Sequence, residues 1–152
     1  MTQLDLFLDE EKVNTSDCVD LSDIDIDFGE ATHSQKICSE TIRILQHLPK
    51  GKYIMYRRDA ESGFPYIINT YLGQRVTPRS SRNDYVAINL KGKKGVRWTR
   101  NIHQIVAMAF IPNVLPKDRV QVDHIDGDKH NYAIENLRWV TPSENNKNRD
   151  FQ

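Results

Sequence analysis

The chain has 152 residues, enough for one domain of ordinary size or for two small modules joined by a short linker. Its cysteines, Cys18 and Cys38, are too far apart to form a Cys-x-x-Cys pair, so neither a zinc ribbon nor a disulfide framework is predicted, and a reducing environment is expected. The amino terminus lacks a basic stretch, and no apolar run approaches the length of a membrane span. We therefore expect a soluble, cytoplasmic protein.

The formal net charge of zero conceals a strong division along the chain. Residues 1–35 contain ten acidic residues and one lysine, whereas the remaining residues contain twenty basic and eleven acidic residues. Residues 8–33 combine these acids with too few apolar residues to sustain a core. We expect residues 1–33 to form an acidic, largely disordered tail, attached to a basic body that can face phosphate.

Residues 34–100 are predicted to form a short helix followed by a small antiparallel β module. Ser34 can cap the helix, whose apolar residues recur at helical spacing until Pro49. Between Lys52 and Arg100, short apolar runs alternate with turn residues, as is typical of strands. This module carries most of the positive charge, and its candidate DNA-binding residues are Arg75, Arg79, Arg82, Lys91, Lys93, Lys94, Arg97 and Arg100.

A second helix is predicted over residues 102–110, where Ile102, Ile105, Val106, Ala109 and Phe110 form one continuous apolar stripe. It should connect the β module to the carboxy-terminal motif and pack its apolar face against both. Together, the helix and the motif make up residues 101–152. His103 at its start is interpreted as a packing or capping histidine in preference to a catalytic one.

The carboxy-terminal segment has the pattern of two strands and a helix. Residues 120–124 and 137–140 are typical of strands, and the Asp126–Asp128 turn opens a long loop between them. Thr141, Pro142 and Glu144 then supply a cap, a preset first helical residue and a capping box, so a helix should begin at Pro142. The predicted class is α+β, and Asn145 falls in the first turn of this helix or just beyond it.

Asp123-His124, then Asn136 twelve residues after His124, then Asn145 nine residues further, resembles the ββα-metal or HNH endonuclease motif over about residues 120–149. The resemblance implies a phage-type or homing-type DNA nuclease, with the preceding β module binding double-stranded DNA. It implies that His124 is the general base, with Asn136 holding its ring, and that Asp123 and Asn145 bind the metal. Neighbouring phosphates would be contacted by Arg138, Lys147 and Arg149.

Many HNH nucleases have His where this chain has Asn145. Because an amide oxygen is a harder ligand than imidazole, the substitution favours Mg²⁺, or Mn²⁺ as the alternative, over Zn²⁺. Adjacent residues on an ideal strand point to opposite faces, so we expect a bend or bulge to bring Asp123 and His124 to one phosphate.

Other interpretations stay open at this point. Asp123, Asp126 and Asn136 can simply shape turns, and the asparagines after Glu144 can be a polar helix surface. His130 is a weaker candidate for the base. A DNA-binding protein that retains the fold without catalysis, or a ribonuclease, fits the same residues.

Gln3, Leu4, Asp5, Leu6 and Phe7 resemble the peptide by which bacterial replication and repair proteins bind the β sliding clamp. An accessible tail can present Leu6 and Phe7 to an apolar groove. The alternatives are a tail that packs on the body of the protein and an acidic segment that shields its basic face.

Overall fold

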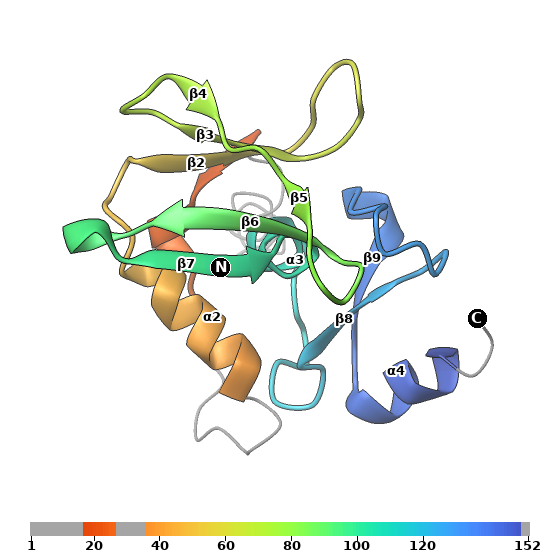
Figure 1. The fold of residues 1–152 in the computed structure, drawn as a ribbon. Helices are drawn as coiled ribbons and strands as arrows, with labels where there is room; N and C mark the ends of the chain where they lie inside the picture. Colours follow the sequence, from red (N-terminus) through yellow and green to blue (C-terminus); the bar gives the residue numbers. More distant parts are fainter. Residues whose placement is uncertain (1–16, 27–35, 150–152) are drawn as a thin grey trace, which may run out of the picture.

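The computed structural model describes residues 17–26 and 36–149, so the Gln3–Phe7 peptide lies outside the described residues. Two antiparallel sheets precede the carboxy-terminal unit (Figure 1). The first sheet has the order β1 (Cys18–Asp20), β2 (Tyr53–Tyr56), β3 (Tyr66–Asn69) and β4 (Gln74–Arg75). The second has the order β5 (Arg79–Ser80), β6 (Val86–Lys91) and β7 (Arg97–Asn101), with the 3-10 turn η3 (Lys93–Gly95) between β6 and β7.

The predicted single sheet is therefore two sheets. The break falls between β4 and β5, where Pro78 has no backbone N–H to contribute to a continuous ladder. The α+β class and the antiparallel pairing are confirmed.

Residues 17–26, within the segment expected to be largely disordered, form regular structure. β1 pairs antiparallel with β2, and the 3-10 turn η1 (Leu21–Asp23) follows it directly. Leu21 is fully buried and Ile24 nearly so, while Asp20 caps the turn by accepting the Ser22 backbone N–H. A few well-spaced apolar side chains are enough here because they add to a core built by the rest of the chain.

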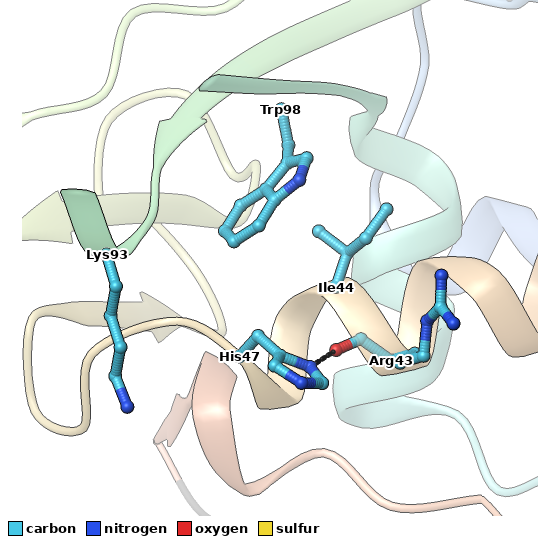
Figure 2. A pocket seen from close by; sticks show the side chains of 5 residues that line it. All are labelled: Arg43, Ile44, His47, Lys93 and Trp98. Atoms are coloured by element: carbon cyan, nitrogen blue, oxygen red, sulfur yellow. Dashed lines mark hydrogen bonds between the residues drawn. The ribbon is translucent and has the colours of Figure 1, made fainter. Parts of the chain in front are cut away.

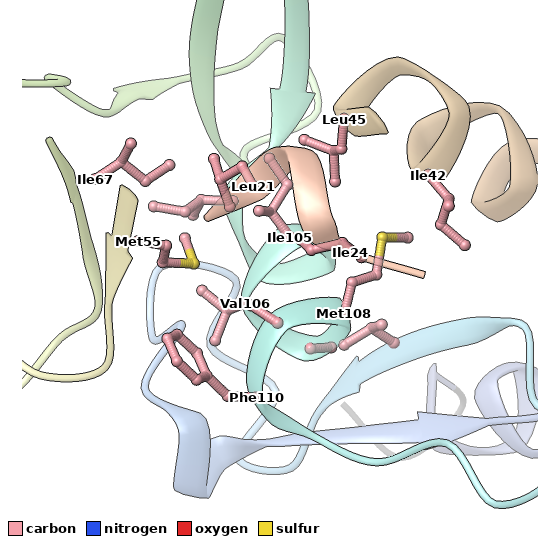
Figure 3. Close-up of a cluster of buried hydrophobic side chains, with 14 of the residues drawn as sticks. Leu21, Ile24, Ile42, Leu45, Met55, Ile67, Ile105, Val106, Met108 and Phe110 are labelled. Carbon is pink, nitrogen blue, oxygen red and sulfur yellow. The ribbon is translucent and has the colours of Figure 1, made fainter. Parts of the chain in front are cut away.

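Helix α2 (Lys36–Gln46) packs beside the sheets, and α3 (Ile102–Phe110) lies at the centre of the core, with the bounds that the apolar stripe predicts. Figure 3 shows Ile105 and Val106 of α3 among side chains from η1, α2, β2 and β3. Within the described residues, no helix is both long and apolar enough to span a membrane.

The carboxy-terminal unit consists of β8 (Gln121–His124), the 3-10 turn η4 (Ile134–Asn136), β9 (Leu137–Val140) and α4 (Pro142–Arg149). The predicted capping box is present: the Glu144 N–H donates to Thr141 Oγ1 at 3.1 Å, and the Thr141 N–H donates to Glu144 Oε2 at 2.9 Å. The predicted strand–strand–helix order is confirmed.

The long loop between β8 and β9 is tied to the sheets by side-chain contacts. His130 Nε2 lies 3.1 Å from Asp84 Oδ1, and Lys129 donates to the Asn83 carbonyl at 3.3 Å. Further along the loop, Tyr132 stacks on Phe64 with ring centroids 4.7 Å apart, and Glu135 forms an ion pair with Arg58. The early part of the chain therefore holds this loop in place.

Candidate active site

Asp123, His124 and Asn145 line one cavity of about 450 Å³. The cavity is completed by Val122 and Gly127 near the end of β8, by Arg149 of α4, by Lys129 of the long loop, and by Asn83 and Tyr85 before β6. Its lining has two cationic side chains, Lys129 and Arg149, against one carboxylate. This charge balance suits a phosphate group.

The position of β8 explains how neighbouring residues reach the same cavity. Among the described strands, β8 pairs with β9 alone, in a regular register through Asp123–Arg138 and His124–Leu137. Its opposite edge has no strand partner in residues 17–26 and 36–149, and a cavity at such an edge can collect side chains from both faces of the strand. Asp123 comes from the α4 side and His124 from the α3 side, so the expected bulge is not needed.

The Asp123 carboxylate is buried, and its hydrogen bonds all end on one oxygen. Oδ2 accepts from Arg138 Nε at 3.1 Å and Nη2 at 2.9 Å, and from Asn148 Nδ2 at 2.9 Å. Within the described residues, Oδ1 has no hydrogen-bond donor and is the oxygen left to bind a cation. Asn148, which we did not expect in the site, thus positions Asp123 together with Arg138.

Asn145 is oriented through its amide nitrogen. Nδ2 donates to Gln121 Oε1 at 2.7 Å, which leaves the Asn145 carbonyl oxygen without a competing donor in the described part of the chain. A carboxylate oxygen and an amide oxygen are hard donors of the kind that Mg²⁺ accepts while it keeps several waters. These two residues fit a divalent metal, although no cluster of three or more His, Cys, Asp or Glu residues occurs in the described ranges.

His124 is buried, and its Nε2 has no hydrogen-bond partner among the described residues. Burial lowers the pKa of His124, while the carboxylates of Asp123, Asp126 and Asp128 oppose that shift. A lowered pKa keeps the imidazole neutral at neutral pH, which is the form that can take up a proton.

The surroundings of His124 are aromatic. Its ring centroid lies 4.7 Å from that of His103 and 5.9 Å from that of Tyr85, and Tyr85 stacks on His103 at 5.0 Å. His103 is buried and is not a helix cap, and burial together with nearby His124 lowers its pKa to about 3. His103 is therefore a neutral packing residue, as expected, and its packing partner is the candidate base.

In the part of the chain that the structure describes, the Asn136 side chain is hydrogen-bonded within the loop and not to the His124 ring, so any hold on that ring would be indirect. Its Nδ2 donates to Asp126 Oδ1 at 2.9 Å and to the Asn131 carbonyl at 2.8 Å, and its Oδ1 accepts the Asp126 N–H at 3.0 Å. Both amide hydrogens are thus used within the loop. Asn136 closes the loop that carries Gly127 and Lys129 to the cavity.

The comparisons with known proteins agree with this geometry. Residues 100–147 match the model of the family described as HNH endonuclease. This part of the chain is similar to HNH endonucleases. Two uncharacterized HNH endonucleases of Acanthamoeba polyphaga mimivirus are 40% and 35% identical over 78 and 77 residues, each covering 51% of this chain.

A solved structure of the HNH homing endonuclease I-HmuI, which concerns DNA binding and cleavage by that enzyme, matches with a TM-score of 0.55 and 27% identity. The match covers 67% of this chain and 53% of that one, so it extends beyond the HNH motif into the sheets. The matched segment spans only 19% and 21% of the two mimivirus proteins, about a fifth of their length.

The basic residues predicted to bind DNA do not form one surface. Arg100 pairs with Ile88 across the ladder and therefore points to the helix side, where its Nη2 lies 3.9 Å from Glu40. Lys91 and Arg97 are opposite each other in the β6–β7 ladder, and both are exposed. Exposed Arg79, Arg82 and Lys94 belong to the same sheet and its loops, and Lys147 is exposed on α4.

Two further predicted DNA contacts are already engaged within the protein. Arg75 forms an ion pair with Asp59 at 2.7 Å, which holds the pKa of that carboxyl well below its usual range, and it stacks over Tyr66 at 3.9 Å. Arg138 is bound to Asp123. His130, the competing candidate base, is exposed and does not line the cavity.

Proposed function

We propose that the chain is a metal-dependent DNA endonuclease that hydrolyses one phosphodiester bond per active site. The observation that carries this proposal is the single cavity that joins Asp123, His124 and Asn145 with the cationic side chains of Lys129 and Arg149. The HNH family match and the similarity to a homing endonuclease support it.

In the proposed reaction, neutral His124 takes a proton from a water molecule that attacks the phosphorus atom. The bond from phosphorus to the 3′ oxygen breaks, leaving a 5′ phosphate and a 3′ hydroxyl. General base catalysis of this kind contributes about 10²–10⁴ in rate. Lys129 and Arg149 hold the substrate phosphate, and Tyr85 and His103 confine the His124 ring.

Asp123 and Asn145 would hold a divalent cation, with Mg²⁺ preferred because both donors are oxygen atoms. When bound, such a cation stabilises negative charge on the phosphate and on the departing oxygen. Arg138 and Asn148 both donate to Asp123 Oδ2. They fix the orientation of the carboxylate and leave Oδ1 for the cation.

Cleavage of supercoiled plasmid in Mg²⁺ tests the proposal. Wild-type protein should convert plasmid to the nicked or linear form, EDTA should prevent this, and His124→Ala should slow it by about 10²–10⁴. Ser143→Ala is the control, because this side chain is exposed on α4 and lies outside the cavity, and it should cleave like wild type. Wild-type protein that leaves plasmid intact in both Mg²⁺ and Mn²⁺ would overturn the proposal.

The contact between Arg138 and Asp123 favours one alternative, a DNA-binding protein that keeps the fold without catalysis. A guanidinium beside the carboxylate already supplies the positive charge that a cation would bring. In that case plasmid would be bound and shifted in a gel but never nicked, and Arg138→Ala would alter neither outcome.

We further propose a nicking or homing-type role in a phage or mobile element, as the homing endonuclease similarity supports. The ratio of open-circular to linear plasmid, with sequencing of the cut ends, separates nicking from double-strand cleavage.

Tethering through Gln3–Phe7 to a bacterial β sliding clamp would raise the local concentration of the enzyme on replicating DNA. Calorimetric titration of the full chain with a clamp, compared with Gln3→Ala/Leu6→Ala/Phe7→Ala, tests this tether. Wild-type protein that does not bind, or binding that survives the triple substitution, would exclude it.

A further inference from the structure

A second cavity, of about 300 Å³, lies far from the HNH site. It is formed between α2 and the β6–β7 hairpin, and its lining consists of Arg43, Ile44, His47, Lys93 and Trp98 (Figure 2). None of these residues lines the HNH cavity. We propose that this cavity binds an unpaired nucleobase of the DNA strand, with the base stacked on Trp98 and its phosphates held by Lys93 and Arg43.

The lining combines an aromatic and apolar floor with a cationic rim. Ile44 is buried and Trp98 is half-buried, whereas Arg43, His47 and Lys93 are exposed. Among residues 17–26 and 36–149, no acidic side chain lines the cavity. Indole faces that stack bases, beside cations that track the backbone, are the usual elements of single-strand binding sites.

The Trp98 indole packs directly on the backbone of Gly92, which has no side chain to obstruct it. A Cβ at this position would come within 2.2 Å of two carbon atoms of the Trp98 ring. The backbone of Gly92 has φ −87°, which other residues adopt readily, so the close approach and not the backbone requires glycine here. Trp98 thus rests on the hairpin backbone, with the ring directed to the cavity (Figure 2).

His47 adds a directed polar group. Its Nδ1 lies 2.5 Å from the Arg43 carbonyl, and because a carbonyl can only accept, Nδ1 carries the hydrogen. Nε2 is the ring nitrogen that this contact leaves for a bound base, which carries both donor and acceptor groups at its edge.

The separation from the HNH site is compatible with one DNA molecule reaching both. β6 runs from next to Tyr85, in the HNH cavity, to Lys91, next to Gly92; six residues of strand span about 20 Å. At about 3.4 Å per nucleotide this corresponds to about six nucleotides. Binding of a base in this cavity requires no cleavage at the HNH site.

The test is a titration of the full chain with an oligo(dT) of eight nucleotides in EDTA. Binding is measured by tryptophan emission and by the anisotropy of the labelled oligonucleotide. Wild-type emission should be quenched on binding. Trp98→Leu should show no quenching of the remaining tryptophan and should bind about 5- to 150-fold more weakly, the usual effect of losing one stacked base. Gly92→Ala should weaken binding in the same way because it displaces the ring.

Arg43→Ala/Lys93→Ala keeps the apolar floor intact and should reduce the slope of log affinity against log salt by about 1.4, or about 0.7 for each lost contact with a single strand. Lys50→Ala, which removes an exposed cation outside the cavity, should leave the slope unchanged.

Three outcomes would overturn the proposal. An abasic oligonucleotide of equal length that binds and quenches as strongly would show that only phosphate is bound. A peptide of residues 5–16 that quenches Trp98 equally would identify the acidic amino-terminal segment of the chain as the occupant. Unchanged binding by both Trp98→Leu and Gly92→Ala, with both proteins folded, would exclude the cavity as a binding site.

Discussion

Substitution of the two motif asparagines separates a structural role from a role at the metal. Asn136 is buried and makes three side-chain hydrogen bonds. One of them is to the Asp126 carboxylate, which is exposed, so water can take the place of Asn136 in that bond. Counting only the two bonds to backbone groups, at about 0.5–1.5 kcal/mol each, Asn136→Ala should lower the free energy of unfolding by about 1–3 kcal/mol. Asn145 is half-buried and has one side-chain bond, to Gln121, so Asn145→Ala should cost less than about 1 kcal/mol.

The assay is urea unfolding followed by fluorescence, with plasmid nicking measured on the same samples. At about 2–4 °C per kcal/mol, Asn136→Ala should also melt about 2–12 °C lower. Asn145→Ala should melt near the wild-type temperature yet lose most of its nicking activity, and Asn145→Asp, which keeps an oxygen ligand, should recover part of it. If Asn136→Ala is as stable as wild type and still fails to nick, Asn136 acts at the reacting centre and our assignment to the loop is wrong.

Three further predictions follow from local contacts. Thr141→Ala removes the α4 cap and should cost about 1 kcal/mol in urea unfolding, whereas Ser143→Ala should cost little. Hydrogen bonding to Asp84 raises the pKa of His130, so the stabilisation is complete below its ordinary pKa and is lost as pH rises through the folded-state pKa. The stability difference between wild type and His130→Gln should therefore be larger near about pH 5.5 than near about pH 8.5, and an equal difference at both would contradict the ion pair. Lys91→Ala/Arg97→Ala should reduce the salt slope of duplex binding by about 1.8, while Arg100→Ala, already near Glu40, should reduce it by less than about 0.9.

The elements that sequence alone predicts correctly are those specified by local chemistry. The start of α4 depends on Thr141, Pro142 and Glu144, which lie within four residues of one another. The bounds of α3 depend on an apolar stripe of nine residues. Both signals are complete within a short window, and the structure confirms both.

The contacts that sequence does not predict are those that join distant segments. Tyr85 reaches His103 and His124, and Asn148 reaches Asp123 across 25 positions. Leu21 appears in an acidic stretch that has too few apolar residues for a core of its own, yet it is fully buried in a core made elsewhere. No periodicity or cap marks such residues, because their partners are set by tertiary packing.

The HNH cavity itself depends on residues outside the family match, which begins at residue 100. Asn83 and Tyr85 precede β6 and still line the cavity. The long loop that carries Lys129 contacts Asp84, just before β6, and Arg58, just after β2. Because Tyr85 also packs against the candidate base, changes in the sheets alter the surroundings of His124 directly. Residues next to the sheets therefore complete the candidate active site, and DNA bound to the sheets would contact the same loop, residues 83–85, that packs against His124.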